Sequence, residues 1–259
     1  MNESVLNMLS DRLAGGGQVL CAWVTMNEPA VAEALAREAF DAVVLDMQHG
    51  AVDFDGATRS ILRVALAGKP TIARVPIGGF ALASQLMDSG ACGILAPMID
   101  SGEDARRLVE SVKFPPLGQR SWGPRAALPL SGLDAPTYLR AANAMTQAIA
   151  MIETRAALDS LDDILSVEGL DGVYVGPSDL SIALANGASV EPRGDAVMSE
   201  ARRVVERAKA HGKYAAMFCF DGADARDMMA LGFQLCTISS DQTLLRGVAR
   251  SELAAARAG

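Results

Sequence analysis

Short runs of consecutive apolar residues alternate with amphipathic stretches along the whole chain. Eight of these runs are rich in Val, Ile and Leu and are continuous rather than alternating, which is typical of strands buried on both faces of a parallel sheet. They cover residues 19–24, 42–46, 71–75, 93–97, 148–152, 172–175, 214–218 and 234–238. The stretches that follow them have helical periodicity, as in residues 54–66 and 198–210. The pattern therefore predicts eight strand–helix units.

Eight such units in 259 residues have the size of an α/β protein of the (β/α)8 TIM-barrel class. No linker, low-complexity tract or charge block interrupts residues 1–259, so we expect a single domain. The structural alternative is an open doubly wound sheet, but no Gly-x-Gly-x-x-Gly follows the first predicted strand. Residues 113–133 are the longest irregular stretch, and their Pro and Gly residues predict a loop without a regular helix.

Composition narrows the classes of function. The net charge of −8 and the pI of about 4.8 argue against a nucleic-acid partner, which needs clustered Lys and Arg. We expect no membrane association, because no run of about 18 apolar residues occurs. The N-terminus lacks the basic start and apolar core of a signal peptide, and the four dispersed cysteines form no CxxC pair. These features predict a cytoplasmic protein with buried free thiols.

Polar residues cluster where the predicted strands end, and this is the rim on which barrel enzymes carry their chemistry. They are Asp46, Gln48 and His49 at the second strand, Arg74 on the third, Glu153 on the fifth and Asp179 after the sixth. One His, one Arg and several carboxylates therefore converge on one rim.

The two acids Glu153 and Asp179 end neighbouring strands and together fit a hard divalent ion such as Mg²⁺ or Mn²⁺. Taken singly, each has a structural alternative, since acids also stabilise the first turn of a helix. His49 is one of two histidines, and a catalytic role is as well supported as a structural one. The other, His211, is expected to end a helix. Arg74 needs an anion, which is either a substrate or a structural partner such as Asp46.

Several longer motifs resemble the HpcH/HpaI aldolases, class II pyruvate aldolases that include 4-hydroxy-2-oxoheptanedioate aldolase. They are LDMQHG at 45–50, ARVP at 73–76, MDSGACGILAPMIDS at 87–101, FPPLGQRSWG at 114–123 and IETRAALDSLDDILSVEGLDGVYVGPSDLS at 152–181. The resemblance runs in order over about residues 20 to 245. It implies a divalent-metal-dependent aldehyde-lyase that forms an enolate of pyruvate or hydroxypyruvate, adds it to an aldehyde and cleaves 4-hydroxy-2-oxo acids.

The resemblance also implies a role for each site residue. Glu153 and Asp179 match the metal ligands, for Mg²⁺ or Mn²⁺ with Co²⁺ or Zn²⁺ as alternatives. Arg74 matches the arginine that binds the keto oxygen, and His49 matches the histidine of proton transfer. Asp46 and Asp88 match two family acids near that histidine, and either of them could orient it. The residues implied to bind substrate are Trp23, Gln48, Gly176, Pro177, Ser178 and Phe218, with Phe218 shaping the aldehyde pocket and core packing as the alternative for Trp23.

Two positions depart from the family pattern. Gln48 replaces the acid of the common form DxEHG, and Met151 replaces a glutamine two residues before Glu153. Both departures affect the expected substrate more than the reaction class. The alternatives within the superfamily are a lyase of acyl-CoA thioesters and an oxo-acid decarboxylase, and the alternative of another class is a non-catalytic barrel subunit.

The family pattern implies a homo-oligomer, often a hexamer built as a trimer of dimers, with a C-terminal helix exchanged between subunits. The apolar tail at residues 243–258 fits that exchange or an ordinary eighth barrel helix.

Overall fold

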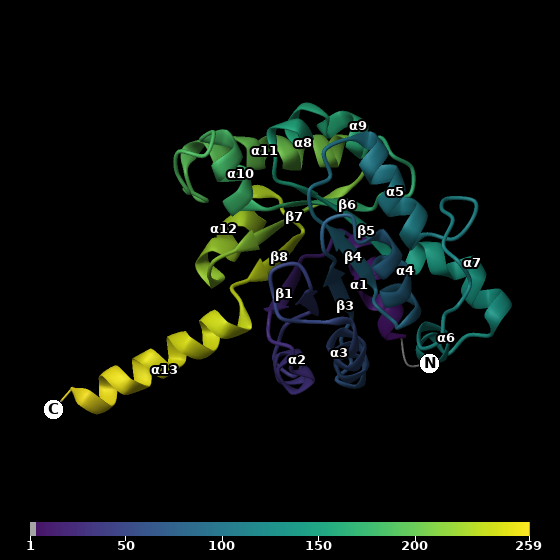
Figure 1. Cartoon of the computed structure of the whole chain (residues 1–259), viewed down its shortest axis with the longest axis horizontal. Helices are drawn as coiled ribbons and strands as arrows, with labels where there is room; N and C mark the ends of the chain where they lie inside the picture. The colour runs from purple at the N-terminus through teal and green to yellow at the C-terminus, as the bar shows by residue number, and fades with distance from the viewer. Residues whose placement is uncertain (1–3, 259) are drawn as a thin grey trace.

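A computed structural model describes residues 4–258 and shows a closed barrel of eight parallel strands in sequence order (Figure 1). The strands are β1 Val19–Val24, β2 Ala42–Asp46, β3 Thr71–Arg74, β4 Gly93–Ala96, β5 Gln147–Ile152, β6 Gly172–Val175, β7 Tyr214–Cys219 and β8 Leu235–Ile238. Each predicted strand agrees with the observed one to within a residue at either end. The predicted (β/α)8 class is confirmed.

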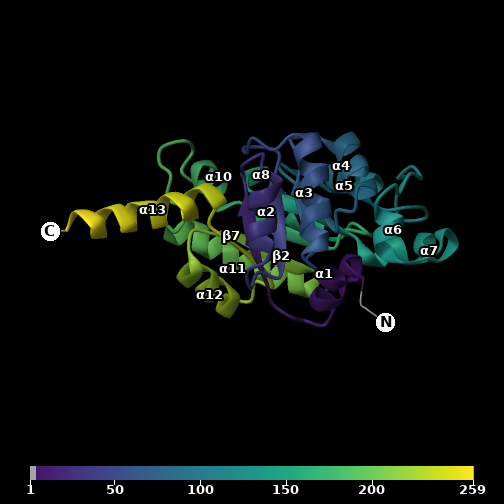
Figure 2. The same cartoon turned by 90° about the horizontal axis from the view of Figure 1, so that it is seen from below.

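Helices follow the strands and cover the outside of the barrel (Figures 1 and 2). They are α2 Pro29–Ala36, α3 Phe54–Leu66, α4 Phe80–Asp88, α5 Gly102–Val112, α8 Arg155–Asp159, α9 Leu161–Leu165, α10 Pro177–Leu184, α11 Asp195–Ala210 and α12 Gly222–Leu231. His211 is the C-cap of α11, as predicted. All four cysteines are buried free thiols, also as predicted.

The prediction of a loop without helix at residues 113–133 was wrong in its last part. The short helix α6 covers Ala127–Ser131, and α7 follows at Ala135–Met145. Pro129 and Pro136 lie near the starts of these helices, where the missing N–H has no partner within the helix in any case. Proline therefore accompanies these helices rather than preventing them, and Asp134 caps α7 by accepting from the Thr137 N–H at 2.8 Å.

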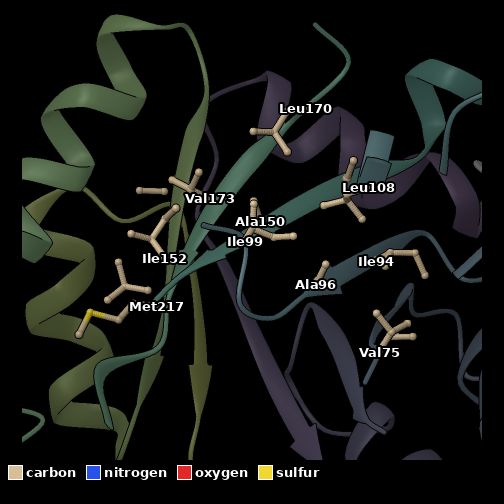
Figure 3. Close-up of a cluster of buried hydrophobic side chains, with 14 of the residues drawn as sticks. Val75, Ile94, Ala96, Ile99, Leu108, Ala150, Ile152, Leu170, Val173 and Met217 are labelled. Carbon is tan, nitrogen blue, oxygen red and sulfur yellow. The ribbon is translucent and has the colours of Figure 1, made fainter. Parts of the chain in front are cut away.

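Strand side chains alternate between the helix layer and the barrel interior. Figure 3 shows the outer layer, where Ile94, Ala150 and Val173 of the strands lie in one cluster with Leu108 of α5. The inner cluster continues down to the N-terminal end of the barrel, where it includes Leu9 of α1, Val5–Ala14. The N-terminal end is thus closed by packing, which leaves the C-terminal end for the site.

The last helix, α13 (Asp241–Arg257), projects away from the barrel (Figures 1 and 2). Asp241 is its one buried residue, whereas Leu245 and Val248 are more than 60% exposed. The helix does not cover the barrel of its own chain, so the alternative of an ordinary eighth barrel helix is not what the structure shows. In the part of the chain from residue 4 to 258, no helix combines the length and apolar character that crossing a membrane requires.

Candidate active site

A cavity opens at the carboxyl ends of the strands. Its lining comes from six of the eight strands or the loops after them. The lining residues are Trp23, His49, Arg74, Met151, Glu153, Tyr174, Gly176, Pro177, Ser178, Asp179 and Phe218. Nine of the twelve residues singled out from the sequence are in this set, and the other three are Asp46, Gln48 and Asp88.

Arg74 and Asp46 form a buried, two-point ion pair across β3 and β2. Arg74 Nε donates to Asp46 Oδ1 at 2.9 Å and Nη2 donates to Oδ2 at 2.6 Å. Burial alone would raise the pKa of Asp46, but the Arg74 guanidinium outweighs it and the pKa is lowered, so the pair is ionised. The structural partner expected for Arg74 is therefore present. No hydrogen bond to Arg74 Nη1 occurs among residues 4–258, which leaves that edge of the guanidinium for a ligand.

Trp23 holds this pair from the side. The Arg74 guanidinium carbon lies 4.7 Å from the centroid of the Trp23 ring. The indole Nε1–H of Trp23 donates to Asp46 Oδ2 at 3.3 Å. Trp23 thus packs in the barrel and lines the cavity at the same time. Because Trp23 contacts both members of the ion pair, it restrains the direction of the Arg74 guanidinium.

His49 lies exposed at the mouth of the cavity, on the loop after β2. Asp46 Oδ1 accepts the backbone N–H groups of Gln48 at 3.0 Å and His49 at 3.2 Å. Asp46 therefore shapes the loop that carries His49, through the backbone. Gln48 is not among the lining residues, and its buried Oε1 has no hydrogen-bond partner in the described chain.

Glu153, at the end of β5, is a buried carboxyl with little compensation. It is 2% exposed, and its Oε1 accepts the Met98 backbone N–H at 2.9 Å. Burial raises the pKa of Glu153 to about 7; the Met98 hydrogen bond opposes this rise, and the Asp179 carboxylate adds to it. Met98 itself has a φ of 54°, an uncommon conformation that places its N–H beside this acid.

Gly176 leaves free space beside the same carboxyl. A Cβ at this position would overlap Glu153 Oε2 and lie 3.0 Å from Met151 Cε. α10 begins at the next residue, and the N–H groups of its first turn have no partner within the helix. Ser178 and Asp179 therefore present backbone donors beside a carboxylate pair.

The side chains that could hold a metal ion in this cavity are carboxylates. Across residues 4–258, no group of three or more His, Cys, Asp or Glu side chains could hold an ion. Glu153 and Asp179 instead supply two carboxylates, with a raised pKa on Glu153 and room at Gly176. Such a set fits a hard divalent cation whose remaining positions are filled by water and ligand oxygens.

Asp88 lies outside this cavity. It ends α4 and forms an ion pair with Arg120 at 2.7 Å. Arg120 in turn stacks on the Phe114 ring at 4.5 Å. Within the described chain no hydrogen bond joins Asp88 to His49, so its orienting role stays a prediction.

Tyr174 is a lining residue that sequence reasoning missed. Its ring centroid lies 6.1 Å from that of Trp23, and Phe218 lies 5.4 Å from Trp23 on another side. The Tyr174 hydroxyl is 2.7 Å from Thr237 Oγ1. Period-two counting back from Gly176 along β6 would have placed Tyr174 inside the barrel.

Comparison with known proteins finds similar sequences over nearly the whole chain. The model of the HpcH/HpaI aldolase/citrate lyase family matches residues 19–247. A hydroxypyruvate/pyruvate aldolase of Rhizorhabdus wittichii is 38% identical, over 94% of this chain and 96% of the relative. A 2-keto-3-deoxy-L-rhamnonate aldolase of Salmonella gallinarum is 31% identical, over 98% of this chain and 94% of the relative.

Solved structures are similar as well. An HpcH/HpaI aldolase/citrate lyase family protein from Burkholderia cenocepacia superimposes with a TM-score of 0.88 at 29% identity, covering 97% of this chain and 100% of that one. An HpcH/HpaI aldolase from Desulfitobacterium hafniense gives a TM-score of 0.90 at 25% identity, covering 97% of both chains.

Proposed function

This chain belongs to the HpcH/HpaI aldolase/citrate lyase family, and on that premise we propose that it is a metal-dependent aldolase of pyruvate or hydroxypyruvate. The reaction joins the enolate of a 2-oxo acid to an aldehyde, and in reverse cleaves a 4-hydroxy-2-oxo acid. The observation that carries the proposal is the convergence of Arg74, His49 and the Glu153–Asp179 pair in one cavity. Relatives named as hydroxypyruvate/pyruvate aldolases support the choice of donor.

Glu153 and Asp179 would hold the divalent cation, Mg²⁺ or Mn²⁺. When bound, the cation supplies Lewis-acid polarisation of the 2-oxo acid. The donor N–H groups of Ser178 and Asp179 hold the substrate carboxylate at the start of α10, because a helix N-terminus attracts an anion. The substrate is thereby oriented with its keto oxygen toward the Arg74 side of the cavity.

Arg74 stabilises the enolate charge, and His49 moves the protons. Arg74 is held by Asp46 and Trp23, so its charge is already in place when negative charge develops on the keto oxygen. His49 takes the proton from C3, and in cleavage it takes the proton of the 4-hydroxyl. Trp23 and Phe218 provide apolar walls that restrict water.

Exchange of the C3 protons of pyruvate and hydroxypyruvate in D₂O tests the proposal without a choice of aldehyde. Protein treated with a chelator is assayed by NMR with and without Mg²⁺. We expect metal-dependent exchange that is lost in Glu153→Ala and retained in Glu168→Ala, which changes an exposed glutamate outside the cavity. Absence of exchange with either acid and any divalent metal would contradict the proposal.

We also propose that the protein is a homo-oligomer, a hexamer built as a trimer of dimers, in which α13 packs on a neighbouring subunit. An apolar groove runs between α2 and α13, lined by Ala30, Val31, Leu35, Leu244 and Val248 among others. The exposed Leu245 and Val248 need cover in water. Light scattering should give a mass several times 27.1 kDa, and Val248→Asp should lower it. A wild-type monomer would contradict the proposal.

A further inference from the structure

A buried carboxylate at the start of helix α13 bonds this helix to the end of β1. Asp241 is 4% exposed, and its Oδ1 accepts the Thr25 backbone N–H at 3.0 Å and the Thr25 hydroxyl at 2.6 Å. Its Oδ2 accepts the Met26 N–H at 2.9 Å. Ser240 caps the helix by accepting from the Thr243 N–H. Asp241 Oδ1 also accepts the Gln242 N–H of α13 at 2.8 Å, so the Asp241 carboxylate joins the first turn of α13 to the end of β1.

The same Thr25 supports the loop that carries His49. Its carbonyl oxygen accepts the Ala51 N–H at 2.8 Å. A Cβ placed on Gly50 would lie 2.9 Å from both Thr25 Cα and Thr25 O, so the loop backbone lies directly against this residue. Thr25 is therefore in contact with α13 on one side and with the His49 loop on the other.

We propose that Asp241 is a positioning residue for His49, acting through Thr25. A carboxylate costs free energy to bury unless its oxygens accept hydrogen bonds. Thr25, which contacts the His49 loop, donates two of the bonds to Asp241, and Met26 and Gln242 donate the others. Since α13 extends away from the barrel (Figures 1 and 2), the seating of this helix sets the position of His49 from outside the cavity. The catalytic consequence rests on the proposed function, whereas the mechanical coupling does not.

Hydrogen–deuterium exchange of the loop amides tests the coupling directly. Asp241→Asn replaces an acceptor oxygen by an NH₂ group that faces the Met26 or Thr25 N–H. We expect the amides of residues 47–51 to exchange at least fivefold faster than in the wild type. Asp134→Asn, a change at the cap of the distant α7, is the matched control and should leave these amides unchanged.

A second pair of variants guards against simple unfolding of Asp241→Asn. Thr25→Ser keeps the hydroxyl and should resemble the wild type, whereas Thr25→Val loses it and should speed loop exchange in the same way. Unchanged exchange of residues 47–51 in both Asp241→Asn and Thr25→Val would overturn the proposal.

The catalytic readout separates positioning from general damage. In Asp241→Asn we expect the rate of pyruvate C3 exchange to fall about tenfold, with the Mn²⁺ dissociation constant within twofold of the wild-type value. Weakened Mn²⁺ binding together with faster exchange throughout the chain would mean a purely structural role and overturn the proposal. If wild-type protein does not exchange pyruvate protons, the proposed function fails, but the amide data still decide the coupling.

Discussion

Both ends of the barrel contain buried ionisable groups, but these groups differ in the partners they have. At the N-terminal end, the 1%-exposed side chain of Lys113 donates to Asp171 at 2.8 Å and to the carbonyl oxygens of Asn143 and Thr146. At the C-terminal end, Glu153 accepts one hydrogen bond from the described part of the chain, from the Met98 N–H, and its pKa is raised to about 7. The side chains of Lys113 and Glu153 are similarly buried, so what distinguishes the site is that Glu153 has no ion-pair partner among residues 4–258.

The Arg74–Asp46 pair shows that the C-terminal end can also compensate charge where this is needed. That pair is bonded at two points and its acid is ionised. The same end of the barrel therefore has one carboxylate, Asp46, with an ion-pair partner and another, Glu153, with none among the described residues. A stabilising ion pair therefore differs from a ligand site in that its buried groups have their hydrogen bonds satisfied.

Loss of His49 should give the largest effect, confined to activity. His49→Ala is expected to lower the rate of pyruvate C3 exchange by about 10²- to 10⁴-fold, the range for general acid–base groups. Because His49 is exposed, the melting temperature should stay within about 2 °C of the wild-type value. Arg74→Ala should slow exchange as much, but it also leaves Asp46 unpaired. A near-normal rate in His49→Ala with saturating metal would remove this role.

Loss of Lys113 should give the opposite result at the other end. Lys113→Ala leaves the partly buried Asp171 without its ion-pair partner and should lower the free energy of unfolding by about 2–3 kcal/mol, less than for a fully buried pair. The activity of the remaining folded protein should stay within about twofold. Urea unfolding measures the first quantity, and Lys209→Ala, at an exposed lysine, is the control. Equal stability of the two variants would contradict a stabilising role for the Lys113–Asp171 pair.

The raised pKa of Glu153 predicts a pH-dependent stability in metal-free protein. The folded state holds a proton on Glu153 up to about pH 7, whereas the unfolded chain releases it near 4.5, so stability is lost as pH rises between these values. Glu153→Gln removes this loss and should gain about 2–3 kcal/mol relative to the wild type between pH 5 and pH 8. The measurement is urea unfolding of both proteins from pH 5 to pH 8 in the presence of a chelator. The same pH dependence of the free energy of unfolding in the wild type and in Glu153→Gln would contradict the raised pKa.

The smallest effect is expected from the neutral hydrogen bond between Tyr174 and Thr237. Tyr174→Phe keeps the ring in the cavity wall but leaves the buried Thr237 hydroxyl without its partner, at a cost of about 1 kcal/mol. The exchange rate should stay within about threefold, measured beside thermal unfolding. A larger loss of rate would mean that the hydroxyl itself contacts substrate.

Much of the architecture was open to prediction because strands and helices leave different periods in the chain. All eight strands and the rim positions of Arg74, Glu153 and Asp179 followed from counting apolar runs. The helices α6 and α7 did not, because proline near a helix start and proline inside one look alike in sequence. Tyr174 was not predicted to line the cavity, because an aromatic residue in a buried strand has the same sequence pattern whether it packs in the core or lines a site.

Local periodicity and contiguous motifs are enough to predict the order of the strands, the family and the set of polar residues at the carboxyl rim. Which partners compensate the charges of those residues depends on the folded chain. Three such contacts are the Arg74–Asp46 pair, the hydrogen bond from the Met98 N–H to Glu153 and the hydrogen bond from the Thr25 hydroxyl to Asp241. They join residues that are 28, 55 and 216 positions apart. Closure of the barrel brings such distant residues together, and no local pattern records which partners they meet.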